Sequence, residues 1–82
     1  MTKDKLFEFA REKDWDNVLE ICRSTHSPSE VAVKVNKKES HLLIEFRVMC
    51  ALGLMQLIKK VDGKYAYIAT ELGIEFLESR NA

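Results

Sequence analysis

The chain has 82 residues, 46% of them hydrophobic, which is enough for one hydrophobic core and predicts a single domain. Its 13 basic and 13 acidic side chains give a formal net charge of zero, and with only 3 glycines and 1 proline it is not a low-complexity chain. The longest uncharged stretch, residues 48–58, is 11 residues long and too short to cross a bilayer.

Two helices are predicted at the start of the chain, within residues 1–13 and 14–24. Their apolar stripes are Leu6, Phe9 and Ala10 in the first and Trp15, Val18, Leu19 and Cys22 in the second. At about 100° per residue these stripes point in nearly opposite directions, so one straight helix cannot bury both. We therefore predict a break near Lys13 and Asp14, with Asp14 as the N-cap of the second helix.

Residues 27–52 predict a short helix, a turn and a longer helix. Ser27 before Pro28, with Glu30 three residues after the serine, is a typical helix start with a capping box. That helix is expected to end near residues 35–36, where a lysine-rich turn follows. The second helix is expected from Glu39 to Leu52, closed by Gly53, because glycine tolerates the left-handed conformation.

A hairpin and a last helix complete the predicted order. Two short strands within residues 55–68 flank Asp62 and Gly63, a dipeptide that strongly favours a two-residue turn. Thr70 is the expected N-cap of a helix over residues 70–79. Its inward-facing residues are expected to be Leu72, Phe76 and Leu77.

The charges are unevenly distributed along the chain. Residues 33–64 contain seven basic and three acidic side chains, a net charge of +4, whereas the segments before and after each carry −2. A basic segment between acidic flanks indicates a surface that faces a polyanion. The alternative is that these charges are scattered over solvated faces.

The order of elements and two local motifs resemble the winged helix-turn-helix family. Leu52-Gly53-Leu54 resembles the end of the family's recognition helix, and residues 67–77 resemble its "Tyr-x-x-Thr-x-x-Gly-x-x-Phe-Leu" ending. The resemblance covers residues 15–79 and is strongest for small archaeal and bacterial regulators. It implies an α+β, mostly helical fold with a three-helix core, a two-stranded wing and extra N- and C-terminal helices.

The resemblance also implies a transcriptional regulator that binds double-stranded DNA as a homodimer. The implied DNA-contacting residues are Lys37, Lys38, Ser40, His41, Ile44, Arg47, Lys59, Lys60, Lys64 and Tyr65. Among them Arg47 is the best candidate for a bidentate contact to guanine, with Ser40 and His41 for lesser base contacts. The lysines would hold phosphates without reading sequence.

An apolar ridge on the same helix favours a second hypothesis. Ile44, Val48 and Ala51, flanked by Leu43, make the implied DNA face partly apolar, and Glu45 nearby would repel phosphate weakly. Such a ridge is also typical of a surface that packs against protein. The chain could therefore be a winged-helix module for protein–protein contact around Ile44.

A homodimer interface is expected on the first and last predicted helices, because the apolar stripe of the first helix points away from that of the second. The candidate interface residues are Leu6, Phe7, Phe9, Ala10, Ile74 and Leu77. A doubled set of phosphate contacts and a fixed half-site spacing would favour such a dimer. Packing of the first helix on the chain's own core is the equally weighted alternative.

Neither catalysis nor a cofactor is predicted from this sequence. His26 is interpreted as a residue at a helix C-terminus, and the spacing of Cys22, His26, His41 and Cys50 gives only weak support to a metal site, so none is predicted. The cysteines are expected to be free thiols. With no visible signal peptide, no membrane segment and no evident small-molecule site, we expect a cytoplasmic protein that is not an enzyme.

Overall fold

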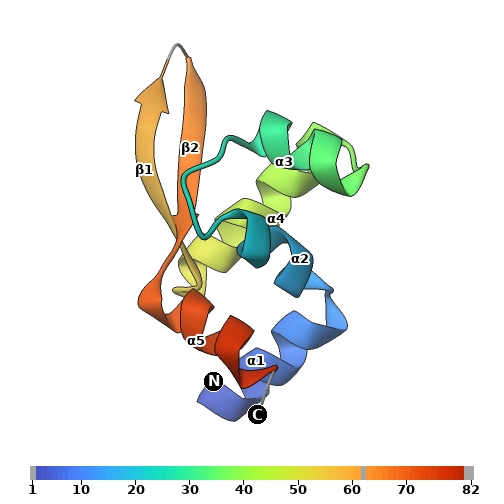
Figure 1. Ribbon diagram of the computed structural model, residues 1–82, viewed down its shortest axis with the longest axis vertical. Helices are drawn as coiled ribbons and strands as arrows, with labels where there is room; N and C mark the ends of the chain where they lie inside the picture. Colours follow the sequence, from blue (N-terminus) through green and yellow to red (C-terminus); the bar gives the residue numbers. More distant parts are fainter. Residues whose placement is uncertain (1, 62, 81–82) are drawn as a thin grey trace.

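The computed structural model describes residues 2–61 and 63–80, with the backbone alone for residues 60, 61 and 64. Over these residues the chain is α+β and mostly helical, with five helices and one antiparallel hairpin (Figure 1). The elements are α1 (Lys3–Glu12), α2 (Trp15–Ile21), α3 (Pro28–Val35), α4 (Glu39–Ala51), β1 (Met55–Val61), β2 (Lys64–Ala69) and α5 (Glu71–Ser79). The hairpin projects from one end of the helical body, and the start of α1 and the end of α5 lie at the other end.

The predicted break between the first two helices is present, although Asp14 does not cap the second. Asp14 has a φ of 57°, the left-handed conformation, and its side chain makes no capping hydrogen bond. The reason is that α1 and α2 are joined by only two residues, so the chain must reverse sharply there, and aspartate tolerates this conformation better than most residues. Helix α2 also ends at Ile21, earlier than predicted.

Helix α1 packs on the chain's own core, which is the alternative that the sequence left open beside a partner interface. Leu6 and Phe7 are each 7% exposed and Ala10 is fully buried. The rings of Phe7 and Phe76 meet edge to face, with centroids 5.4 Å apart. Leu77, also predicted for the interface, is fully buried as well. The two remaining interface candidates, both partly buried against the same core, are Phe9 and Ile74.

Helix α3 begins and ends as predicted. The Ser27 hydroxyl accepts from the N–H of Glu30, and the Glu30 carboxylate accepts from the N–H of Ser27, so the capping box is present. The hydrogen bond from the Ser27 backbone, followed by that from its side chain, lowers the pKa of Glu30. The helix ends at Asn36, which is left-handed (φ 55°), and a short turn leads into α4.

The hairpin has the predicted turn position and an unpredicted bulge. Val61 pairs with Lys64, so a two-residue turn lies between them; Asp62 is outside the described residues, and Gly63 has a φ of 77°. The pairing register shifts by one residue between Leu57 and Lys59. Residue 58 is therefore left without a partner in β2, which is the geometry of a β-bulge.

Strand β2 is held to the helical body by the segment that joins α2 to α3. His26 and Tyr67 exchange two backbone hydrogen bonds of 3.0 and 2.8 Å, and the N–H of Ala69 donates to the Cys22 carbonyl. The interpretation of His26 as a helix C-terminal residue is therefore wrong, because it lies in extended chain beside the hairpin. This pairing fixes the direction in which the hairpin leaves the body.

The end of α4 and the start of α5 meet at a corner built around Thr70. The Thr70 hydroxyl accepts from the N–H of Gly73 and donates to the carbonyl of Gly53, and the Thr70 N–H donates to the carbonyl of Leu54. Thr70 is thus the N-cap of α5 as predicted. Gly53 has a φ of 82°, which lets the chain leave α4 and pass under this cap.

The core lies between the helices and the base of the hairpin. Its largest fully buried side chains are Leu19, Leu42, Phe46, Met49, Leu54, Phe76 and Leu77. Among the described residues, none of the helices has the length and apolar character needed to span a bilayer.

Candidate nucleic-acid interface

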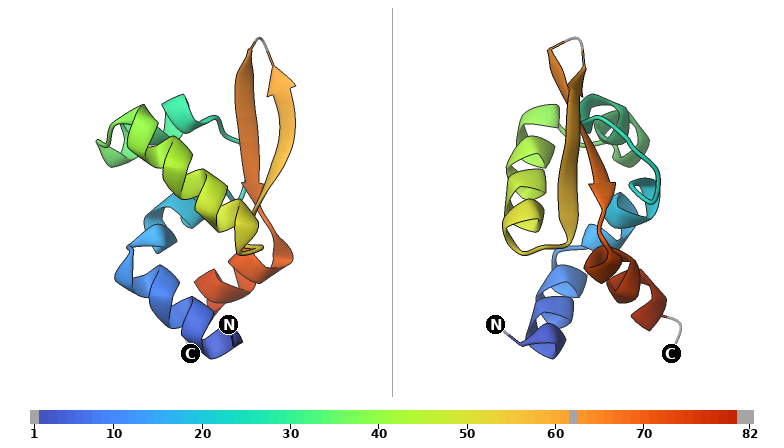
Figure 2. Two further views of the ribbon diagram at one scale, coloured as in Figure 1. Left: turned by 180° about the vertical axis from the view of Figure 1, so that it is seen from behind. Right: turned by 90° about the vertical axis from the view of Figure 1, so that its left-hand side faces the viewer.

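The outward face of α4 consists of six exposed side chains, none of which is a carboxylate. Because α4 turns Leu42, Phe46 and Met49 into the core, the residues on its opposite side are left in solvent. We define the outward face as Ser40, His41, Ile44, Arg47, Val48 and Ala51, all exposed. The helix crosses the body beside the hairpin, as Figure 2 (left) shows. The residues predicted to contact bases from this helix are therefore brought together on one surface.

Tyr67 of β2 packs against α4. Burial raises the pKa of the Tyr67 hydroxyl and the Cys50 thiol adds to this, whereas the positive charge of Arg47 lowers it. The Tyr67 ring packs edge-on against Phe46, with centroids 4.9 Å apart, and lies 6.4 Å from the ring of exposed Tyr65. The contact between α4 and β2 is therefore made by Phe46 and Tyr67, and each of these elements also carries an exposed candidate, Arg47 on α4 and Tyr65 on β2.

The turn before α4 carries two exposed lysines, one of which is paired. Lys38 occupies the N-cap position of α4 without a side-chain capping bond. The Lys37 ammonium lies 3.7 Å from a carboxylate oxygen of Glu45. Glu45 is half-buried at the side of α4, so its charge is turned away from the outward face and is partly neutralised. The expected repulsion of phosphate by Glu45 is correspondingly reduced, and Lys37 is less available than Lys38.

The hairpin contributes one described lysine and several exposed apolar side chains. The residues predicted to contact DNA from the hairpin are Lys59, Lys60, Lys64 and Tyr65. The first and last are exposed, whereas the side chains of the other two lie outside the described part of the structure. At the bulge, Leu57 and Ile58 are 46% and 49% exposed.

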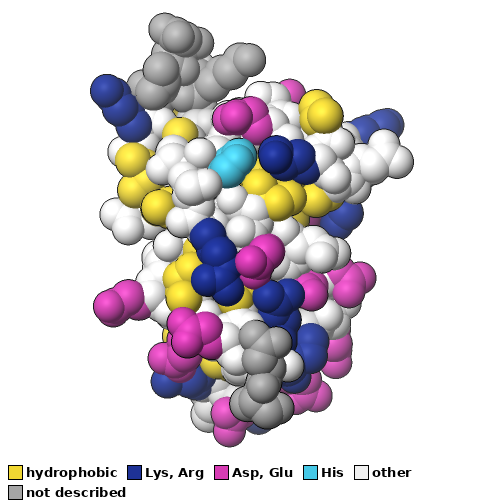
Figure 3. Space-filling model, viewed as in Figure 1, with side chains coloured by type: hydrophobic (Ala, Val, Ile, Leu, Met, Phe, Trp, Pro, Cys, Tyr) yellow, Lys and Arg dark blue, Asp and Glu magenta, His cyan; other side chains and the backbone are white. Residues whose placement is uncertain are grey.

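Carboxylates gather away from this surface, around α5 and the neighbouring helices. On the face seen in Figure 3 they are more frequent over the half of the molecule that contains α1, α2 and α5 than over the half that contains the hairpin. Several are paired within this region: Asp16 and Glu20 contact Arg80 at 3.4 and 2.8 Å, and Glu75 contacts Lys3.

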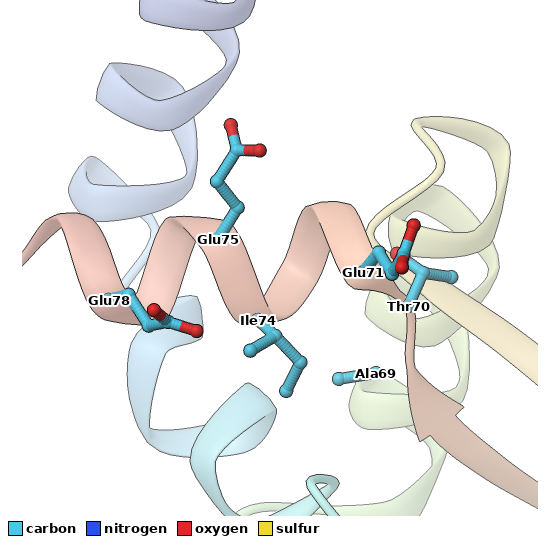
Figure 4. A pocket seen from close by; sticks show the side chains of 6 residues that line it. All are labelled: Ala69, Thr70, Glu71, Ile74, Glu75 and Glu78. Carbon is cyan, nitrogen blue, oxygen red and sulfur yellow. The ribbon is translucent and has the colours of Figure 1, made fainter.

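A shallow hollow of about 690 Å³ lies along α5, lined by Ala69, Thr70, Glu71, Ile74, Glu75 and Glu78. In Figure 4, Glu75 extends to the side of α5 opposite Ile74, where α1 lies. Three carboxylates around one open hollow are unfavourable for a polyanion. Most of the acidic side chains of the two flanks thus lie on α1, α2 and α5 rather than on α4 or the hairpin.

No family model, curated protein or solved structure matches this chain. Its function is therefore inferred from the side chains and their arrangement.

The cysteines and histidines do not come together in a reactive cluster. Cys22 is fully buried, which raises its pKa to about 12, and burial also raises the pKa of the half-buried Cys50. His41 lies on the outward face of α4, whereas His26 lies at the β-bridge. Within the described residues, no three His, Cys, Asp or Glu side chains are grouped so that they could hold a metal ion.

Two features of this surface were not predicted from the sequence. The ion pair of Lys37 with Glu45 joins residues eight positions apart across a turn, and the i and i+8 spacing gives no signal for it. The bulge beside the exposed Leu57 and Ile58 has no glycine or other turn residue to indicate it. The alternation of β1 alone would have suggested that one of these two residues is buried.

Proposed function

We propose that this chain is a winged helix-turn-helix protein that binds double-stranded DNA and regulates transcription. The order of its elements supports this: α2, α3 and α4 follow one another as a helical unit, α3 and α4 are joined by a short turn, and the hairpin follows α4. In helix-turn-helix proteins the second helix of the pair enters the major groove. Here that helix is α4, and the hairpin is the wing.

The observation that carries the proposal is the composition of the outward face of α4. This face contains Arg47 and no carboxylate, although the whole chain has as many acidic as basic side chains. Lys38 at the start of α4, next to the exposed Glu39, and Lys59 on the wing add positive charge beside this face. In the proposed complex Arg47 contacts guanine, Ser40 and His41 make lesser base contacts, and the lysines hold phosphates.

Fluorescence anisotropy of a labelled mixed-sequence duplex of about 30 base pairs, titrated at about 50 and about 200 mM salt, tests the proposal. We expect affinity to fall steeply with salt. Lys59→Ala should weaken binding to every sequence and reduce the log–log salt slope by about 0.9, the value for one lost phosphate contact.

Lys5→Ala is the matched control, because Lys5 is an exposed lysine on α1, far along the chain from α4 and the hairpin. It should leave the slope unchanged. Equal effects of the two substitutions would assign the salt dependence to net charge alone, and the absence of binding at low salt would refute the proposal.

The alternative function, a protein–protein module, is favoured by the 59% exposure of Ile44. Under that hypothesis Ile44→Asp abolishes binding to a protein partner, whereas Lys59→Ala has little effect. Homodimerisation also stays a prediction. Four of the six residues first considered for its interface are buried within one chain, so a dimer would have to use other residues as well. The stoichiometry of the anisotropy titration, combined with sedimentation of the free protein, tests it.

A further inference from the structure

The middle of the outward face of α4 is apolar, although it is exposed to solvent. Ile44 is 59% exposed and Val48, one turn later, is 40% exposed, with Ala51 exposed beyond them. The polar residues of this face are at its start, and Arg47 lies to one side of the apolar stripe. Ile44 is not part of the core, because Leu42, Phe46 and Met49 are the residues of α4 that are buried in it.

We propose that this stripe reads the C5-methyl groups of thymine in the major groove, an inference that rests on the proposed binding of DNA. The thymine methyl is the one apolar group that base pairs present in that groove. Ile44 and Val48 are separated by about 6 Å along the helix, which is close to two base-pair steps of about 3.4 Å. The preferred sites therefore contain thymines about two base pairs apart, next to a guanine contacted by Arg47.

The charges around the stripe favour DNA over an apolar protein surface. Arg47 lies beside the stripe, Lys38 precedes it at the start of α4, and Lys59 is exposed on the neighbouring wing. The carboxylate nearest to the stripe in the sequence, Glu45, is half-buried and paired with Lys37. An apolar ridge with cations around it and no carboxylate on its face matches a groove that has methyl groups on its floor and phosphates on its edges.

Replacing thymine by deoxyuridine tests the inference directly, because it removes the methyl group and keeps the hydrogen-bonding groups of the base. Two A·T-rich duplexes of the same sequence, one with thymine and one with deoxyuridine, are titrated by anisotropy at one salt concentration. The protein should bind the thymine duplex about fourfold more tightly for one buried methyl and about tenfold or more for two. Ile44→Ala should reduce this ratio towards one.

Val33→Ala is the matched control, because Val33 is an apolar residue of α3 that is 83% exposed and lies outside the proposed interface. It should keep the ratio of the unsubstituted chain. Circular dichroism checks that both variants are folded, which is expected since both side chains are mainly in solvent.

Each other outcome overturns the inference in a distinguishable way. Equal affinity for the two duplexes, with a steep salt dependence, refutes methyl recognition and leaves the proposed DNA binding standing. A thymine preference that Ile44→Ala retains assigns the preference to DNA shape rather than to this stripe. Failure to bind either duplex at low salt refutes the proposed function itself, and the stripe then becomes a candidate protein-binding surface.

Discussion

Of the three glycines, Gly73 has the least room for a side chain, and substituting it by alanine should strongly destabilise the protein. Gly73 lies in the first turn of α5, directly against the chain that leaves α4. A Cβ placed on it would be 2.3 Å from the carbonyl oxygen of Leu54 and 3.3 Å from the Cβ of Ala69. The first distance is about 1 Å shorter than a normal contact, and the obstructing atom belongs to the backbone.

Two opposing effects determine the size of the change. Alanine favours a helix over glycine by about 1 kcal/mol, so Gly73→Ala would stabilise α5 if the site were open. Overpacking costs about 1–3 kcal/mol or more. Displacing the Leu54 carbonyl also weakens the hydrogen bond that it accepts from Thr70 at 3.1 Å, worth about 1 kcal/mol. Because the obstructing atom belongs to the backbone, the overpacking cost lies in the upper part of its range, at about 2–3 kcal/mol. The three contributions then leave a net loss of about 2–3 kcal/mol, a decrease in Tm of about 10–20 °C.

Thermal and urea unfolding, followed by circular dichroism, measure this loss. Gly63→Ala is an informative control: its Cβ would meet nothing within 4 Å, but its φ of 77° is unfavourable for alanine, so it should cost only about 1–2 kcal/mol. Glu78→Ala, on the exposed side of α5, should change stability by less than about 0.5 kcal/mol. A Tm for Gly73→Ala equal to or above that of the unsubstituted protein would refute the close approach of α5 to Leu54.

Two further predictions concern a helix cap and a buried thiol. Ser27→Ala should lower the free energy of unfolding by about 1 kcal/mol in urea titrations, because the capping box of α3 is lost, whereas the exposed Ser24→Ala should have little effect. The Cys22 pKa is raised from 9.0 to about 12, so above pH 9 the unfolded chain releases a proton that the folded chain keeps. Stability should therefore be unaffected by this group below pH 9 and decline by up to about 1.4 kcal/mol per pH unit above it. Cys22→Ala, although less stable, should show a shallower decline; parallel pH profiles would contradict the assignment.

The helix starts and the hairpin turn could be predicted because each depends on a few neighbouring residues. Ser27 and Glu30, three positions apart, each accept a hydrogen bond from the other's backbone N–H. The Thr70 hydroxyl likewise accepts one from the Gly73 N–H. The turn after Val61 likewise follows from the residues that form it. These are interactions that propensity and spacing describe well.

The relation of segments that are distant in the sequence could not be predicted in the same way. Periodicity identified the stripe on α1 but not its partner, and Phe7 packs on Phe76, which follows it by almost the whole length of the chain. The pairing of His26 with Tyr67 depends on where β2 passes, which a single polar segment such as residues 23–27 does not indicate. The sequence left open whether this stripe contacts its own chain or another, because an apolar stripe has the same pattern in both cases.

The candidate interface was easier to predict than the tertiary contacts, since exposed residues follow directly from the inner face of one helix. Once Leu42, Phe46 and Met49 face inward, the 3.6-residue period leaves Ser40, Ile44 and Arg47 outside. The pairing of the neighbouring charges could be seen only in the structure. Glu45 was expected to repel phosphate weakly, and its carboxylate is paired with the Lys37 ammonium.

Folding and binding therefore place different demands on the two sides of α4. Any residue that prefers helix would serve the fold at position 44, since substitutions at such exposed sites usually change stability by less than about 0.5 kcal/mol. A large apolar side chain that is 59% exposed gains little from folding and makes association with other molecules more favourable. Ile44 is therefore a position at which the proposed binding can be tested with little effect on the fold. If Ile44→Ala keeps the Tm and loses the preference for thymine, the two demands are separated experimentally at a single residue.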